Sequence, residues 1–192
     1  MKDISLHILD IAQNSITAGA RRLDLELSEA DGWITLTVTD DGCGMSPELL
    51  ARVCDPFTTT RTTRKMGLGI PLLRMSAEMT GGSLSIESTQ GAGTRIQARF
   101  DGRHIDCPPL GDLADTIALL IQGAPELHTV YTHRREGQAI TLDTDDLHAQ
   151  LGGGISLAEP EVVLWLREYL KEQEESLNLY LPFGGYTEKD RG

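Results

Sequence analysis

The sequence predicts a two-layer α/β sandwich, with helices over one face of a mixed sheet, followed by a small C-terminal α/β extension. Two observations predict this fold. Stretches with helical spacing of apolar residues alternate along the chain with stretches of strand-like alternation. Their order is helix, hairpin, helix, loop, helix, hairpin, which suits helices packed on a sheet. Because the composition shifts after Asp101, we expect one domain over 1–101 and an extension over 102–192.

The larger unit contains three expected helices, two expected hairpins and one long loop. Isoleucines recur on one helical face of 3–18, and the alternating runs 23–28 and 33–40 predict a hairpin. The remaining segments are a short helix from 47 to about 53, a loop over 55–66, a helix over 71–79 and a second hairpin over 81–100. The loop is long enough that we expect it to be functional.

The extension also mixes helices and strands. We predict a helix over 110–121, a hairpin over 127–143 that turns near Glu136-Gly137, and an amphipathic helix over 159–177.

Charge and composition exclude several classes of function. The formal net charge is −12, and residues 101–192 hold 17 acidic against 7 basic side chains. Such a surface repels phosphate backbones, so nucleic-acid binding is not expected. No apolar run is long enough to span a membrane, and the start of the chain lacks a signal-peptide pattern. Three scattered cysteines without a C-x-x-C pair indicate neither disulfides nor zinc, so we expect a cytoplasmic protein.

Two polar residues lie one turn apart on the first predicted helix, Asp10 and Asn14. The amide oxygen of Asn14 is a hard, neutral ligand that suits Mg²⁺. Asp10 lies about 6 Å back along the helix axis, from where it could orient or deprotonate a water near the last phosphate of a nucleotide. The alternative is that Asp10 is an ordinary exposed acid and Asn14 a solvated helix residue.

The second predicted strand ends in the sequence VTDDGCGM. The carboxylate of Asp40 can accept a hydrogen bond from the adenine amino group, whereas guanine presents a carbonyl oxygen there and would be repelled. Gly42 and Gly44 let the main chain approach a flat base and adopt positive φ angles. Met45 would supply an apolar wall. The alternative is a plain turn between two elements.

A threonine-rich basic loop leads into the glycine pair of MGLGIPLLR. Arg61 and Lys65 can neutralise phosphate charge, so we expect the loop to close as a lid over ATP. Gly67 and Gly69, with Leu68 between them, precede a helix and would aim amides and the positive helix end at phosphate oxygens. The alternative is a solvated basic loop.

These four blocks, in this order, resemble the N, G1, F and G2 boxes of the GHKL superfamily of gyrase, heat-shock chaperone, histidine-kinase and mismatch-repair ATPases. The resemblance covers about the first hundred residues. It implies a Bergerat-type fold with ATP and Mg²⁺ as cofactors. It also implies that Asn14 binds Mg²⁺, that Asp40 and Thr94 contact the adenine side, and that Gly67 and Gly69 contact phosphates.

Two features depart from this family. The ATP-hydrolysing branches carry a glutamate where Asp10 stands, and aspartate is shorter by one methylene. Histidine kinases carry their phosphoacceptor histidine ahead of the N box, which here begins almost at Met1, so autophosphorylation by that route is not expected. In the C-terminal unit, HIDCPPLGDLADTI resembles an extension of stand-alone, histidine-kinase-like ATP-binding proteins.

The sequence therefore predicts a regulatory ATP-binding protein in signal transduction. It would be an Mg²⁺-dependent ATPase switch or a kinase acting on a partner protein of unknown identity. One alternative is a non-catalytic ATP sensor, whose lid closure changes its affinity for the partner. Another is a degenerate interaction module that no longer binds nucleotide. The sequence also allows a homodimer.

Overall fold

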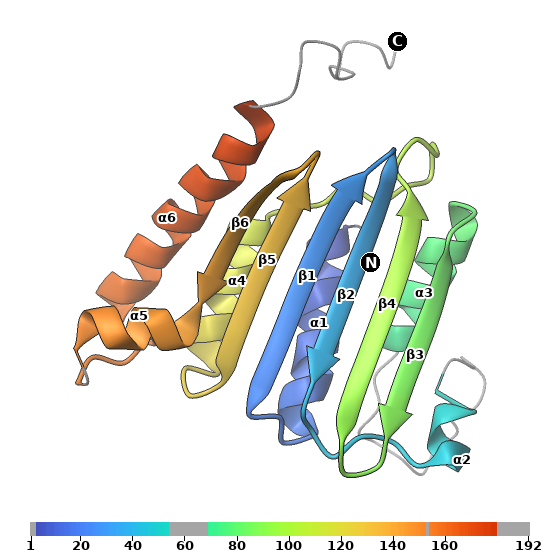
Figure 1. Cartoon of the computed structure of the whole chain (residues 1–192), viewed down its shortest axis with the longest axis horizontal. Coiled ribbons are helices and arrows are strands. Elements are labelled where there is room, and N and C mark those ends of the chain that lie inside the picture. Colours follow the sequence, from blue (N-terminus) through green and yellow to red (C-terminus); the bar gives the residue numbers. More distant parts are fainter. Residues whose placement is uncertain (1–2, 54–68, 153, 180–192) are drawn as a thin grey trace.

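The computed structural model describes residues 3–53, 69–152 and 154–179 (Figure 1). In chain order the elements are α1 (Ile4–Thr17), β1 (Arg22–Ala30), β2 (Trp33–Asp40), α2 (Pro47–Leu50), α3 (Gly69–Met79), β3 (Ser83–Thr89), β4 (Gly93–Asp101), α4 (Leu113–Gly123), β5 (His128–Arg135), β6 (Gln138–Asp143), α5 (Thr144–Leu151) and α6 (Pro160–Leu179).

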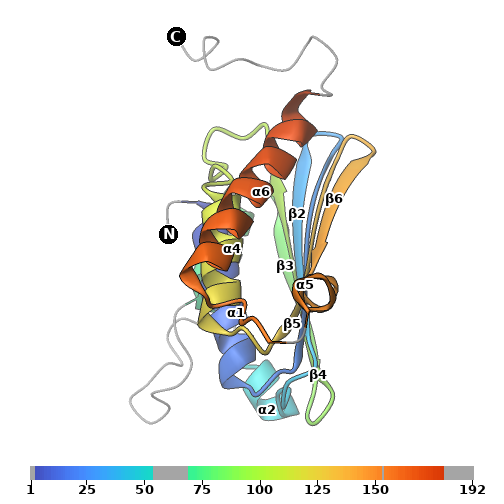
Figure 2. The same ribbon diagram turned by 90° about the vertical axis from the view of Figure 1, so that its left-hand side faces the viewer.

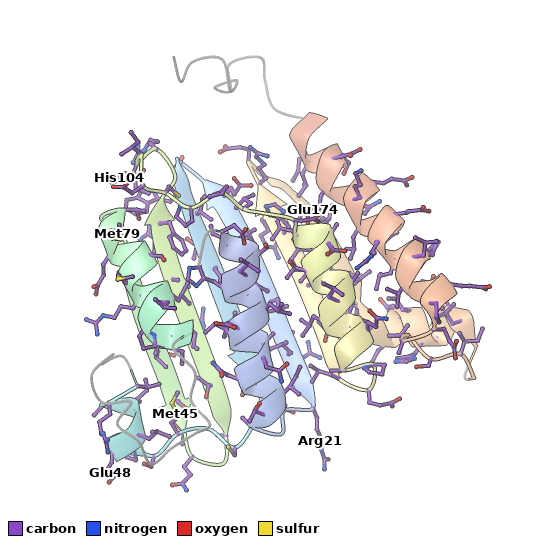
Figure 3. All side chains as sticks on the ribbon, turned by 180° about the vertical axis from the view of Figure 1, so that it is seen from behind. Arg21, Met45, Glu48, Met79, His104 and Glu174 are labelled. Carbon is purple, nitrogen blue, oxygen red and sulfur yellow. The ribbon has the colours of Figure 1, made fainter. Side chains whose placement is uncertain are left out.

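The strands form one mixed sheet in the order β3-β4-β2-β1-β5-β6. β1 pairs in parallel with β5, and every other neighbouring pair is antiparallel. Seen edge-on, α1, α4 and α6 lie on one side of the sheet (Figure 2). From behind, α3 lies beside them on the same side (Figure 3). The predicted α/β sandwich with helices on one face of a mixed sheet is therefore confirmed.

The core lies between the helices and the sheet. Alternate strand residues point to opposite faces, so the leucines of β1 are buried while Asp24 and Glu26 reach the open face. Each fully buried aliphatic side chain contributes roughly 1.5–3 kcal/mol relative to exposure. The largest fully buried side chains are Tyr131, Phe100, Ile4, Ile8, Ile11, Leu23, Leu25, Leu27, Leu36, Leu73, Ile117 and Ile121.

Two tight turns confirm two of the three predicted hairpins. Between β1 and β2, Asp31 and Gly32 have φ angles of 55° and 78°, and between β5 and β6, Glu136 and Gly137 have φ angles of 45° and 84°. Two successive positive φ angles are typical of the type I′ turn, whose twist matches that of the paired strands.

The C-terminal residues extend the same sheet. β5 and β6 add to the edge of β1, so the sheet is continuous across residue 101. The division into 1–101 and 102–192 stays a prediction about folding units. Within the described residues, no helix combines the length and the apolar character needed to cross a bilayer.

Two helices of the extension differ from the prediction, and capping explains both. α4 begins at Leu113 rather than Leu110, because the side chain of Asp112 accepts a hydrogen bond from the backbone N–H of Asp115 (2.8 Å). α5 was not predicted. It begins where the Asp143 side chain accepts a hydrogen bond from Asp145 N (2.8 Å).

A buried histidine links α6 to the sheet. His133 on β5 is only 2% exposed. Its Nδ1 lies 2.7 Å from Glu174 Oε2 on α6, and its Nε2 lies 3.0 Å from Glu29 Oε1 on β1. The hydroxyl of Tyr131 donates to Glu174 Oε1 (2.6 Å), and Arg135 Nε lies 3.6 Å from Glu29 Oε1.

Two opposing effects set the charge of this histidine. Burial by itself lowers the pKa of His133, but hydrogen bonds to Glu174 and Glu29, together with their negative charges, outweigh it and raise the pKa to about 9. The imidazole is therefore a cation near neutral pH, held between two carboxylates.

Candidate nucleotide-binding site

Asp40 ends β2 with both carboxylate oxygens held in place. Oδ2 accepts a hydrogen bond from Ser15 Oγ on α1 (2.7 Å), and Oδ1 accepts one from the backbone N–H of Gly42 (2.9 Å). Ser15 is buried and Asp40 is partly exposed. Each carboxylate oxygen has about two acceptor sites, so the carboxylate is oriented and still has acceptor capacity.

The glycine turn after Asp40 packs tightly on its neighbours. Gly44 has a φ of +62°, and a Cβ built there would overlap the carbonyl oxygen of Thr89. A Cβ on Gly42 would lie 2.9 Å from the Cβ of Ala18. The N–H of Cys43 donates to the Ala18 carbonyl (2.9 Å). The turn is thereby fixed between the end of α1 and the β3–β4 hairpin.

Ser88 contacts both Met45 and Thr94, which the sequence predicts to lie beside the adenine base. Its Oγ accepts a hydrogen bond from the N–H of Met45 (2.9 Å) and lies 2.9 Å from Thr94 Oγ1. Thr94 is the register partner of Asp40 on the neighbouring strand. The predicted residues Asp40, Gly42, Met45 and Thr94 are therefore neighbours at one end of the sheet.

Asp10 and Asn14 lie on the α1 side of this site. A Cβ built on Gly69 would lie 3.1 Å from Asp10 Oδ2, so Asp10 packs against the first residue of α3. The positive end of the α3 dipole favours a carboxylate there. The prediction started this helix at Pro71, but Gly69 already belongs to it. Asn14 is half-buried one turn further along α1.

The other predicted phosphate-side residues, Arg61, Lys65, Gly67 and Leu68, lie outside the described residues. The described part of the chain thus brings together the base side of the predicted site and its α1 side. The contribution of the basic loop stays a prediction.

His7, one turn before Asp10, connects α1 with α3. Its side chain is fully buried, and Nε2 lies 3.2 Å from Ser76 Oγ. Burial, above all, lowers the pKa of His7 to about 4, so the ring is neutral at pH 7. His7 is therefore a buried, hydrogen-bonded contact between the two helices.

Asp41 connects the site to the C-terminal extension. Its Oδ1 accepts the backbone N–H groups of Arg22 (2.8 Å) and Arg21 (2.7 Å), which hold the pKa of Asp41 below its usual range. The guanidinium of Arg22 lies 3.2 Å from Nδ1 of His128, the first residue of β5. A chain of polar contacts therefore runs from the turn after β2 to the extension.

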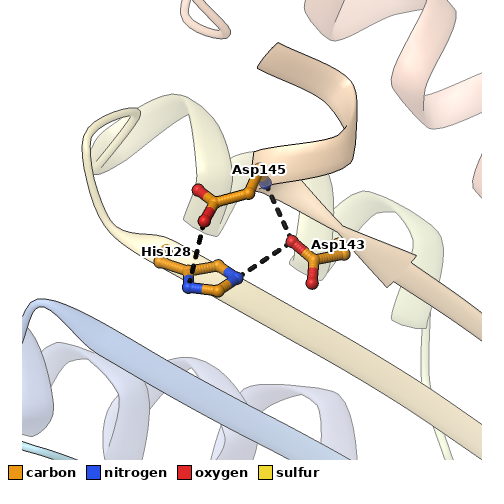
Figure 4. Close-up of side chains that lie close together, drawn as sticks. All are labelled: His128, Asp143 and Asp145. Atoms are coloured by element: carbon orange, nitrogen blue, oxygen red, sulfur yellow. Dashed lines mark hydrogen bonds and ion pairs between the residues drawn. The ribbon is translucent and has the colours of Figure 1, made fainter. Parts of the chain in front are cut away.

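His128 lies between two aspartates (Figure 4). Its Nε2 is 2.9 Å from Asp143 Oδ1, and its Nδ1 is 3.4 Å from Asp145 Oδ2. These three residues are close enough to hold a metal ion. However, the carboxylates lie at opposite edges of the imidazole, and the Arg22 guanidinium beside Nδ1 would repel a cation. We interpret the cluster as a bridge that ties α5 to β1.

The fold and the oriented carboxylate at the end of β2 define an ATPase-type nucleotide-binding domain. A family model described as histidine kinase-, DNA gyrase B-, and HSP90-like ATPase matches residues 2–104, and the chain belongs to this family. The resemblance drawn from the four sequence blocks is thus confirmed.

Similar proteins include sensor kinases. Histidine protein kinase DivJ of Caulobacter vibrioides is 33% identical over 99 residues, which cover 48% of this chain and 17% of that protein. A putative sensor histidine kinase NtrY-like of Rickettsia conorii is 26% identical over 107 residues, which cover 55% of this chain and 18% of that protein. The chain therefore matches less than a fifth of the length of either relative.

A solved structure supports the fold. The crystal structure of the N-terminal domain of a DNA repair protein matches with a TM-score of 0.57 at 12% identity, covering 80% of this chain and 58% of that chain. At this identity the likeness shows the fold alone.

Ser15 is a site residue that sequence reasoning missed. Replacing Ser15 with alanine should weaken ATP binding by roughly two- to tenfold, because the loss of one hydrogen bond worth about 0.5–1.5 kcal/mol leaves Asp40 less well oriented. Titration calorimetry with ATP checks this. Thr17→Ala is the matched control, since that exposed hydroxyl on the same helix contacts only the Gln13 carbonyl among the described residues. Equal affinities for both variants would contradict the role of Ser15.

Proposed function

We propose that this chain binds Mg²⁺-ATP between α1, the turn after β2 and the start of α3, and that it acts as a regulatory enzyme on a partner protein. Its activity would be that of an ATPase switch or a protein kinase. One observation carries the proposal: the carboxylate of Asp40, held by Ser15 and Gly42, at the end of β2.

Adenine recognition follows from the chemistry of Asp40. The carboxylate is fixed from two sides and accepts hydrogen bonds only, so it complements the adenine amino group and repels the guanine carbonyl. Gly42 and Gly44 let the turn beside this carboxylate pack closely against Ala18 and Thr89. Thr94, whose hydroxyl contacts Ser88, lies on the adjacent strand and would complete the base side.

The α1 side suits a magnesium ion and phosphates. Within the described ranges, no residue hydrogen-bonds to the side-chain amide of Asn14, so its oxygen is available as a ligand. Mg²⁺ prefers such oxygen ligands and would neutralise phosphate charge when bound. We propose that Asn14 holds the ion and that Asp10 orients a water near the last phosphate.

The contact of Asp10 with α3 favours a second candidate, a non-catalytic ATP sensor. The carboxylate already packs on Gly69 at the start of α3, and aspartate is one methylene shorter than the glutamate of the ATP-hydrolysing branches, so it reaches less far toward an attacking water. In that case ATP would order the site and change the affinity for a partner without turnover.

Labelled ATP distinguishes the two candidates. We expect purified protein with Mg²⁺ and γ-labelled ATP, alone or with candidate partners, to release or transfer label. Asp10→Asn should lower this rate at least tenfold, because amide nitrogen cannot act as a base. Asp146→Asn, an exposed change on α5, is the control. Bound ATP that is never turned over would support the sensor, and a chain that binds no ATP would overturn both.

A further inference from the structure

The face of the sheet that carries no helices has a hollow beside the β1–β2 turn. This is the face toward the viewer in Figure 1. The hollow has a volume of about 370 Å³ and is open to solvent. Its walls come from β1, β2 and β4, and among its lining residues are Ser28, Trp33, Thr35, Gln97 and Arg99. None of these residues belongs to the nucleotide site.

Arg99 is the main charged group of the hollow. Its guanidinium lies 4.6 Å from the centroid of the Trp33 ring, and such stacking holds the planar group in one orientation. The register partners of Arg99 on either side are Thr35 and Ser83, which carry no charge. Among the described residues, no carboxylate forms an ion pair with Arg99.

Two other arginines on this face are neutralised by carboxylates of the same face. Arg22 pairs with Asp24 (2.7 Å), and Arg134 pairs with Glu26 (2.9 Å). In a chain with a net charge of −12, Arg99 is thus a local cation that forms no ion pair within the part of the chain that the structure describes. A guanidinium presents a fork of N–H donors that matches a carboxylate.

Neutral polar groups surround this cation. Ser28 and Thr35 contribute hydroxyl groups to the wall. The side-chain amide of Gln97 donates to Thr37 Oγ1 (3.2 Å), which leaves its carbonyl oxygen for a peptide N–H. One carboxylate opposes the arginine: Asp31, in the turn at the rim. The hollow therefore suits a short peptide with separate acidic side chains better than a dense polyanion.

We propose that this hollow is a docking site for an acidic peptide segment of a partner protein, with an aspartate or glutamate carboxylate bound to Arg99 and the peptide backbone lying along Trp33 and Gln97. The proposal is independent of ATP binding. The positive charge of Arg99 favours an acidic partner, while the overall negative charge of the chain disfavours nucleic acid.

Trp33 fluorescence provides the test. Trp165→Phe removes the only other tryptophan while keeping an aromatic ring against Tyr169. In this background, a blocked Gly-Glu-Ser-Glu-Gly peptide should change the emission of Trp33 saturably. Arg99→Gln should weaken binding tenfold or more, and Arg99→Lys several-fold, because lysine keeps the charge but loses the fork. Asp31→Asn should strengthen binding, since it removes the opposing charge.

Arg95→Gln is the matched control. Arg95 is exposed on the same face of β4, four residues away and outside the hollow, so its replacement should change the affinity less than twofold. Thermal melts verify that the Arg99 variants are folded. The proposal is overturned if the peptide gives no saturable signal, if the same peptide with lysines binds equally well, or if Arg95→Gln weakens binding as much as Arg99→Gln.

Discussion

Replacing Asp40 with asparagine is expected to weaken ATP binding by about ten- to hundredfold, which corresponds to a charge-assisted hydrogen bond of roughly 1.5–3 kcal/mol. Asparagine has nearly the same shape, and its Oδ1 can still accept the N–H of Gly42. The protein should therefore stay folded. The substitution removes the negative charge that we propose faces the adenine amino group.

Calorimetry with ATP and GTP measures this effect. The preference for ATP over GTP should shrink in Asp40→Asn, because an amide N–H can donate to the guanine carbonyl that a carboxylate repels. Asp24→Asn, a partly exposed change on the open face, is the control. Unchanged ATP affinity would contradict our assignment of Asp40 to the base.

The second large effect is the dependence of the free energy of unfolding on pH. The pKa of His133 is about 9 in the folded protein and 6.5 in its unperturbed state. A raised folded pKa means that the stabilisation is complete below about pH 6.5 and is lost as the pH rises through 9. The shift corresponds to a loss on the order of 3 kcal/mol. Glu29, Glu174, Tyr131 and Arg135 are the titratable groups around this histidine, and the raised pKa of Tyr131 keeps that phenol neutral over this range.

Removing the histidine should be more damaging than deprotonating it. His133→Gln leaves Glu29 and Glu174 without their shared cation, and breaking a buried ion pair in this way destabilises by about 3–5 kcal/mol. Urea unfolding at pH 6, 7.5 and 9.5 measures the free energy of unfolding. Between pH 6 and 9.5 the free energy of unfolding should fall much less in His133→Gln than in the unmodified protein. His104→Gln, at an exposed loop position, should show the same decrease as the unmodified protein. An identical pH profile for His133→Gln and the unmodified protein would contradict this account.

Local patterns predicted most of the elements. The spacing of isoleucines located α1, and the Glu136-Gly137 pair located the turn between β5 and β6, because few residues adopt positive φ. The parallel pairing of β1 with β5 could not be predicted in this way. It joins residues more than a hundred positions apart, as Arg22 with His128, and is accompanied by contacts of α4 with α1.

The sequence likewise predicted some residues of the candidate site and missed another. Asp40, Gly42 and Gly44 stand in one short stretch whose residue types predict the roles that we propose for them. Ser15 does not, since its role appears only when α1 lies beside the end of β2 and the hydroxyl meets a carboxylate 25 residues away. An isolated serine next to an asparagine on a helix carries no such signal.

The position of β1 has a consequence for anyone who seeks a minimal nucleotide-binding fragment. A chain cut after Asp101 would lose β5, and the main-chain donors and acceptors of β1 along that side would be left without their partners. An uncovered strand of this length invites pairing with other copies of the fragment. The residues after Asp101 thus protect the edge of β1. Deleting them would lower the solubility of the remaining ATPase-like fragment.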